Sequence, residues 1–201
     1  MPDTATSLGG RLPLADRATL TDAQLELFDR YIAEALPWAR RAGFVMQSAD
    51  GELVGPFNPS LESPEISARF WDYQVAEEAY STLSGRERQI VILAVGAIWR
   101  SPYELYAHSA AARTAGLTTE EVDTLATGEM PDSLSPRERC AWRFTHQLTA
   151  ERHIDQPLYD EAVAMLEPHG IADMVHLIGA YQTVCGLLNA FDIPAPEGTG
   201  G

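Results

Sequence analysis

The segment that decides the fold runs from Leu83 to Val122 and reads LSGRERQIVILAVGAIWRSPYELYAHSAAARTAGLTTEEV. Three times in this segment a serine or threonine is followed, three residues later, by a glutamate, which is the pattern of a capping box at a helix start. The pairs are Ser84 with Glu87, Ser101 with Glu104 and Thr118 with Glu121. Each pair precedes residues with helical periodicity, so the segment predicts helices over residues 85–99, 102–115 and 119–127.

The same start signals occur on both sides of this segment, at Thr21 with Gln24 and at Ser135 with Glu138. With the spacing of apolar residues, they predict further helices over residues 22–42, 64–82, 136–150, 156–168 and 171–190. No stretch alternates between apolar and polar residues as a half-buried strand would. We therefore predict an all-α fold, a single-domain helical bundle over residues 19–196, with a flexible N-terminal arm at 1–18 and a flexible tail at 197–201.

One short motif occurs twice. LSGRER at Leu83–Arg88 is followed 51 residues later by LSPRER at Leu134–Arg139, and each copy opens a predicted helix. Two origins remain open at this point: a duplicated helical hairpin, or two helices that share the same capping chemistry.

Composition excludes several classes of function. The net charge is −15, which would repel nucleic acid and anionic membranes, so we expect neither as a partner. All 14 basic residues are arginine, which excludes Schiff-base chemistry on a lysine. The two cysteines, Cys140 and Cys185, lie in apolar helical patterns and are predicted to be buried. With no long apolar run and no signal-like start, we expect a cytoplasmic protein.

The strongest candidate for chemistry is the predicted helix that opens at Ser101. Glu104 and His108 lie four residues apart, so their side chains share one face of the helix and can form an acid–base pair. Arg100 and Ser101 precede the pair and are candidate substrate-binding residues for an acidic group. A structural alternative also stands, in which Glu104 only completes the capping box of Ser101.

Two further residues are candidate substrate contacts. His176 lies on the last predicted helix, away from its main apolar stripe, and faces solvent or a different neighbour. Phe57 lies in the segment of residues 43–61, which is too rich in glycine and proline for a helix but apolar enough to form an ordered pocket wall. No HExxH or paired-cysteine motif is present, so we expect no metal and no cofactor.

The order of these motifs resembles the carboxymuconolactone decarboxylase family, within the alkylhydroperoxidase-like superfamily. The resemblance rests on GPFNPSLESPEIS (Gly55–Ser67), on the segment of residues 83–122, on LSPRERCAWRFTHQL (Leu134–Leu148) and on YQTVCGLLNAFDIPAP (Tyr181–Pro196). The most specific part is Tyr-Glu-x-x-x-His with the Ala-Gly-Leu that follows it. The resemblance implies a helical bundle of the alkylhydroperoxidase-like type.

The resemblance also bears on the reaction. Peroxidases of this superfamily carry two cysteines and a histidine spaced CxxCxxxH, and these positions correspond to Ser101, Glu104 and His108. The glutamate that those peroxidases carry upstream corresponds to Gln89. Because a thiol peroxidase needs a thiolate to attack the peroxide, the missing cysteines argue against the redox branch.

What remains resembles the decarboxylase branch, so our leading hypothesis is a cofactor-independent lyase that acts on a small lactone or carboxylic acid. In this reading His108, paired with Glu104, donates a proton to carbon. Two alternatives stay open: a repurposed relative that catalyses isomerisation, hydrolysis or ring rearrangement, and a non-catalytic oligomeric binding protein. The resemblance also implies a homo-oligomer, a trimer or a hexamer.

Overall fold

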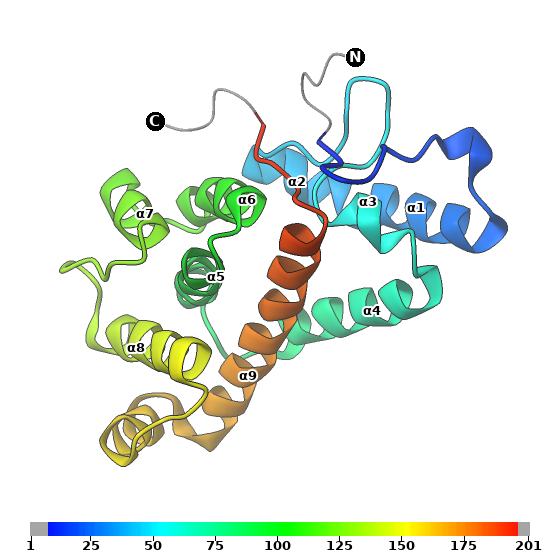
Figure 1. The fold of residues 1–201 in the computed structure, drawn as a ribbon. Helices are drawn as coiled ribbons and strands as arrows, with labels where there is room; N and C mark the ends of the chain where they lie inside the picture. Colours follow the sequence, from blue (N-terminus) through cyan, green and yellow to red (C-terminus); the bar gives the residue numbers. More distant parts are fainter. Residues whose placement is uncertain (1–7, 197–201) are drawn as a thin grey trace.

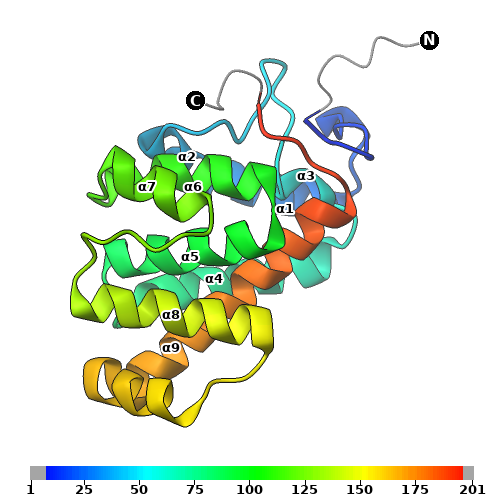
Figure 2. The same ribbon diagram turned by 60° about the vertical axis from the view of Figure 1, so that its left-hand side comes forward.

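The computed structural model describes residues 8–196, and within that range it contains helices and no β-strand, as predicted. Figures 1 and 2 show the arrangement of the helices. The α-helices are α1 Asp22–Glu34, α2 Leu36–Ala42, α3 Phe57–Ser60, α4 Pro64–Tyr80, α5 Gly85–Trp99, α6 Pro102–Thr114, α7 Thr119–Ala126, α8 Pro136–Glu151 and α9 Gln156–Ala190. A short 3-10 helix at Arg17–Thr19 precedes them.

Two helix boundaries differ from the prediction. The helix expected at 22–42 divides at Ala35 into α1 and α2, because Pro37 lies in the first turn of the second helix. The helices expected at 156–168 and 171–190 run on as α9, which is broken only at Glu167. Glu167 precedes Pro168 and takes a non-helical conformation with φ 59° and ψ 166°. The clash with the following proline ring accounts for the extended ψ, whereas the positive φ is a strained conformation for a residue other than glycine.

The core is organised around α5, which packs against α6, α7, α8 and α9. Figure 2 shows α6, α5 and α8 as successive layers, and Figure 1 shows α9 crossing between this group and α4. Helix α4 is different from the others. All of its residues are described, and none of them is fully buried. It contacts α1 and α9 but leaves a space in front of α6, and this space becomes important below.

Reciprocal ion pairs join the start of α5 to the start of α8. Arg86 on α5 bonds Glu138 of the α8 capping box at 2.7 Å, and Arg137 on α8 bonds Glu87 of the α5 capping box at 2.5 Å. These residues belong to the two copies of the repeated motif. Each glutamate therefore caps its own helix and also holds the other helix in register.

Helix α9 is long and apolar enough to cross a membrane by length and composition. Its apolar residues instead supply one side of the core, because Met174, Leu177, Ile178 and Cys185 are buried against α5 and α8. These side chains pack as those of a core helix do.

The N-terminal segment corrects one expectation. We predicted a flexible arm over residues 1–18, but from residue 8 onward the segment lies against the body. The amide of Arg11 donates to the carbonyl of Phe191, and the amide of Ala15 donates to the side chain of Asn58. The buried apolar side chains beneath it explain this packing. Residues 1–7 and the predicted tail at 197–201 lie outside the described residues.

The segment of residues 43–61, predicted to contain no helix, is an ordered loop that ends in the short helix α3, and Tyr103 of α6 anchors the loop. The Tyr103 hydroxyl donates to the carbonyl oxygen of Val45 at 2.5 Å, and its ring lies directly against Gly55. Gly55 has φ +68°, and a Cβ atom there would stand 2.2 Å from Cζ of Tyr103. Glycine is therefore required at this position both for its backbone conformation and for space.

A pair of glycine variants separates these two requirements. Gly43 has φ +86° with no atom within 4 Å of an added Cβ, so Gly43→Ala should destabilise the protein by about 1 kcal/mol through backbone strain alone. Gly55→Ala adds the clash with Tyr103, and we expect a further loss of about 1–3 kcal/mol. Urea unfolding of both variants measures the difference, and equal losses would contradict the anchoring role of Tyr103.

Candidate active site

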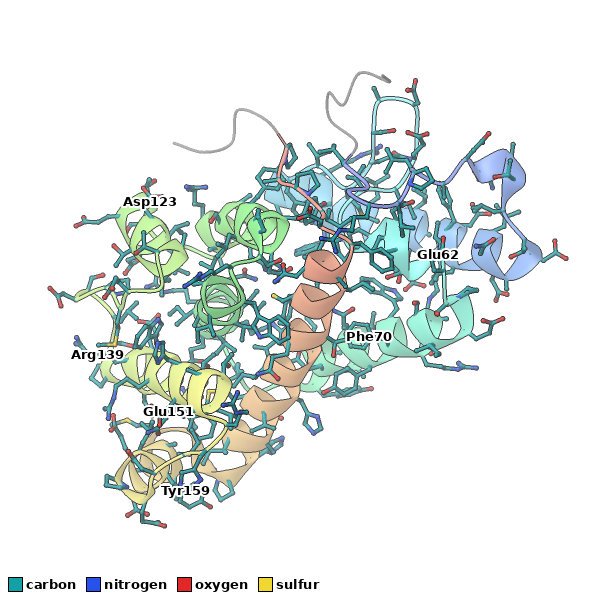
Figure 3. The ribbon with its side chains drawn as sticks, viewed as in Figure 1. Glu62, Phe70, Asp123, Arg139, Glu151 and Tyr159 are labelled. Atoms are coloured by element: carbon teal, nitrogen blue, oxygen red, sulfur yellow. The ribbon has the colours of Figure 1, made fainter. Side chains whose placement is uncertain are left out.

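A cavity of about 940 Å³ lies between α4 on one side and α1, α2, α6 and α9 on the other. Glu62 and Phe70, labelled in Figure 3, belong to the lining on the side of α4. The lining is mainly apolar and rich in aromatic rings, which include Tyr31, Trp38, Phe44, Phe57, Phe70, Trp71, Tyr103, Tyr181 and Phe191. The predicted pocket-wall segment of residues 43–61 contributes Phe44 and the Pro56–Ser60 region to it.

Glu104 and His108 of α6 reach this cavity together. Both residues are buried, with exposed fractions of 2% and 4%, and both line the cavity. The distance from Nε2 of His108 to Oε1 of Glu104 is 3.4 Å. Nδ1 of His108 lies 2.9 Å from Oε1 of Gln89 on α5. Because an amide oxygen only accepts, Nδ1 is the donor, and in the neutral ring Nε2 is left as the acceptor that faces Glu104.

Burial decides where the proton of this pair lies. It raises the pKa of Glu104 to about 8, because the charged carboxylate loses its hydration. Burial also lowers the pKa of His108 to about 3, and the nearby Arg88 cation adds to this effect. At neutral pH the pair therefore consists of a carboxylic acid and a neutral imidazole. The carboxyl Oε1 makes no hydrogen bond among residues 8–196, and its neighbour Nε2 of His108 lies 3.4 Å away, so no short hydrogen bond withholds the acid proton from a ligand.

Arg88 and Tyr181 complete the polar part of the cavity. Arg88 of α5 donates to Oε1 of Glu77 on α4 at 2.5 Å, with both side chains largely buried. Burial alone would lower the pKa of Arg88, but Glu77 holds it above its ordinary value. The ring of Tyr181 packs edge-on against His108, at 4.9 Å between centroids. Burial raises the pKa of Tyr181, so its hydroxyl stays protonated and can donate.

The structure brings some of the predicted site residues together and separates others. Glu104, His108 and Phe57 line the cavity. Arg100 does not: it ends α5 in a left-handed conformation with φ 51°, and its side chain is exposed. His176 is also exposed and outside the lining, and its Nδ1 lies 2.8 Å from the hydroxyl of Tyr73.

The predicted capping box at Ser101 is wrong. Ser101 is the N-cap residue of α6, but its side chain accepts no capping hydrogen bond. Its hydroxyl is buried and interacts with the thiol of Cys185 instead of with a backbone amide of α6. The amide of Ser101 is already bonded to the carbonyl of Gly96, which closes the end of α5, and the Glu104 side chain lies beside His108 instead of folding back. A capping role therefore does not explain why a glutamate occupies position 104.

Sequence reasoning gave no role to Arg88 or Tyr181. One signal for Arg88 was present, because it is the last charge before the apolar run of α5, and a charge beside such a run needs a partner or a cavity. Tyr181 stood on the apolar stripe of its helix and was indistinguishable from a core residue. Gln89 was identified only by its correspondence to a glutamate of the peroxidases, and the structure places it against His108.

Both cysteines are buried, as predicted. Burial raises the pKa of the Cys140 thiol to about 11 and also raises that of Cys185. Neither residue lines the cavity. These thiols are therefore poor sources of a reactive thiolate at neutral pH. In residues 8–196, no group of three or more His, Cys, Asp or Glu side chains is placed to hold a metal ion.

Comparison with protein families supports the resemblance drawn from the sequence. Residues 64–147, which include Arg88, Gln89, Glu104 and His108, match the model of the Carboxymuconolactone decarboxylase family. This match agrees with the resemblance that the sequence motifs predicted. Comparison with curated proteins gave no match.

Solved structures extend the likeness to nearly the whole chain. An uncharacterized peroxidase-related protein from Silicibacter sp. is 19% identical, with 100% of this chain and 98% of that chain covered and a TM-score of 0.73. A peroxidase-related protein from Ralstonia eutropha, described as an alkylhydroperoxidase AhpD core, is 15% identical, with 94% and 93% covered and a TM-score of 0.72. The debrominase Bmp8 in complex with 2,3,4-tribromopyrrole is 16% identical, with 97% and 95% covered and a TM-score of 0.69. At these identities the likeness confirms the all-α, AhpD-like fold.

The protonation of Glu104 has a consequence for stability. The unfolded chain releases this proton near pH 4.5 and the folded protein near pH 8, so between these values the folded state binds more protons. The free energy of unfolding should therefore fall with rising pH, by about 1.4 kcal/mol per pH unit, and Glu104→Gln should lack this loss. His108 makes the free energy of unfolding rise with pH below pH 6.5, because burial lowers its pKa in the folded protein. This contribution is present in the wild type and in Glu104→Gln, so the difference in stability between the two proteins reports on Glu104.

Urea unfolding of the two proteins at pH 5, 6, 7 and 8 measures this difference. We expect the free energy of unfolding of Glu104→Gln to increase relative to that of the wild type up to pH 8. Above pH 8 the difference between the two proteins should stay constant. Glu120→Gln, at an exposed position of α7, controls for the removal of one carboxylate from a strongly acidic chain. A difference that stays constant with pH would show that Glu104 is ionised in the folded protein.

Proposed function

We propose that this protein is an acid–base enzyme of the decarboxylase type that acts on a carboxylic acid or carboxylated lactone. The observation that carries the proposal is the buried Glu104–His108 pair, whose carboxyl Oε1 makes no hydrogen bond to a described residue and which lines a 940 Å³ cavity beside a buried arginine. A structural pair in a packed core would have neither the open space nor the unused donor.

Each residue has a separate role in this proposal. Gln89 holds Nδ1 of His108 as the donor, so that Nε2 faces Glu104 and keeps its carboxyl group in place. Glu104 carries the proton that is transferred, in place of His108, which the sequence had led us to expect, because burial keeps the carboxyl group protonated and the imidazole neutral. Arg88 supplies the positive charge for an anionic substrate, and the Tyr181 hydroxyl, which makes no hydrogen bond to another described residue, is the second donor.

These roles suffice for a decarboxylation. The bond from the carboxylate to the adjacent carbon breaks, carbon dioxide leaves, and the electron pair passes through a double bond to a carbonyl oxygen. The negative charge stays constant but moves from the carboxylate to this oxygen, where Arg88 and Tyr181 can stabilise it. Glu104 then protonates the carbon and recovers its proton from water. Only donors that act more strongly on the enolate oxygen than on the carboxylate accelerate the reaction.

The proposal is tested by carbon dioxide release from a panel of unsaturated lactone acids and β-keto acids. For the substrate that is turned over, Glu104→Gln should lower kcat by at least about 100-fold, because the amide keeps the shape but has no acidic proton. The wild-type rate should fall as pH rises through the Glu104 pKa of about 8. His169→Gln is a matched control, since His169 pairs with Asp173 at the same spacing but is exposed.

The control variant should keep the wild-type rate. Undiminished turnover by a folded Glu104→Gln variant would refute the assigned role. Specific binding of acids without turnover of any of them would favour the non-catalytic alternative.

A further inference from the structure

The charges around the cavity define the kind of substrate that it can hold. Arg88 is the one arginine among the described lining residues, whereas the glutamates at positions 34, 62, 77, 78 and 104 all belong to the lining. Glu34 is already paired with Arg30, and Glu104 is a neutral acid. Glu62 and Glu78 have no ion-pair partner among the described residues. A first anionic group can bind Arg88, which shares its charge with Glu77, whereas a second one would lie near the unpaired carboxylates.

Arg88 has hydrogen-bonding capacity to spare. A guanidinium group carries five N–H donors, and the only hydrogen bond that the Arg88 side chain makes to a described residue runs from Nη1 to Glu77. The side chain is only 13% exposed, so it is held in place and removed from bulk solvent. The unused donors form a fork that fits the two oxygens of one carboxylate.

The rest of the cavity is suited to an apolar body. The rings of Tyr31, Phe57 and Trp71 contact each other edge-on, with centroids 5.1 Å and 5.5 Å apart around Tyr31. Trp38 packs on Phe44 at 4.9 Å and lies 6.0 Å from His108, so this aromatic wall continues to the acid–base pair. Such rings favour a planar or bulky apolar ligand over a highly hydrated one.

The volume of the cavity also favours a bulky apolar ligand. Its volume of about 940 Å³ lies near the upper end of the range of about 300–1,000 Å³ for pockets that hold drug-sized ligands. A compact lactone that carries two carboxylates would leave most of this space to water and would place its second charge near Glu62 or Glu78.

We therefore propose that the site binds a bulky, largely apolar monocarboxylic acid, with its carboxylate on Arg88 and its apolar body against the aromatic wall of Tyr31, Trp38, Phe44, Phe57 and Trp71. The inference rests on the proposed function for what happens to the bound acid. Binding itself requires no turnover, so the two can be tested separately.

Isothermal titration calorimetry at pH 7 with four probe compounds tests this substrate class. 2-Naphthoate combines one carboxylate with two apolar rings, 2-naphthamide removes the charge, 2,6-naphthalenedicarboxylate adds a second charge, and cis,cis-muconate is a compact dianion. We expect 2-naphthoate to bind at least 10-fold more tightly than each of the other three. Equal or tighter binding of either dianion, or no binding of 2-naphthoate, would overturn the proposal.

Variants of the ion pair test the part played by Arg88. The double variant Arg88→Gln/Glu77→Gln replaces the pair by two amides and leaves no buried charge unpaired, and it should weaken 2-naphthoate binding at least 10-fold with little effect on 2-naphthamide. Glu77→Gln alone should strengthen 2-naphthoate binding several-fold, because Arg88 is then no longer partly neutralised. Unchanged 2-naphthoate binding by the double variant would show that Arg88 does not bind the carboxylate.

Two further proteins complete the experiment. Arg113→Gln/Asp123→Asn neutralises an exposed ion pair outside the lining and should bind 2-naphthoate as the wild type does. Glu120→Gln, which removes one exposed carboxylate outside the lining, should also bind it normally. Loss of binding in Arg113→Gln/Asp123→Asn would show that general charge effects, and not Arg88, govern affinity. Tight binding of the monoacid with no acid turned over would refute the proposed function and leave the binding inference standing.

Discussion

The structure depends on the way in which α5 is held at its start. Arg86 and Arg137 each bond the glutamate that caps the opposite helix, so the first turns of α5 and α8 are fixed together. The next two residues of α5 are Arg88 and Gln89, which extend toward the cavity and toward His108. The repeated motif therefore does more than start two helices. It sets the rotation and register of the helix that presents the polar half of the site.

The second constraint is the incomplete packing of α4. A helix buried on the body would have filled the space in front of α6, and Glu104 and His108 would then be an ordinary buried pair. Because no residue of α4 is fully buried, the space remains open and the pair faces it. Desolvation then has a chemical consequence, since it keeps the proton on Glu104 and keeps His108 neutral at the pH where most enzymes work.

Much of the fold was predictable because capping boxes and prolines act locally. Four of the five predicted boxes form. The fifth, at Ser101, fails because Arg100 ends α5 in a left-handed conformation and the Ser101 amide is used to close that helix, which is a tertiary event that spacing does not show. The Glu104–His108 pair was predictable from its spacing on one helix. The places of Arg88 and Tyr181 in the site were not predictable, since α5, α9 and α6 meet only through long-range packing. Arg100 was predicted to be a site residue only because it is close to Glu104 in sequence.

The central claim is that Glu104 carries the proton of the pair and that His108 is neutral, with its hydrogen on Nδ1. Nitrogen NMR of the imidazole in ¹⁵N-histidine-labelled protein tests this directly, with His108→Gln used to assign the signals. From pH 5 to pH 7 we predict that the two ring nitrogens of His108 remain distinct, one protonated and one not. An imidazolium signal from His108 in this range, with both nitrogens protonated, would mean that Glu104 is a carboxylate, and the account of the site would be wrong.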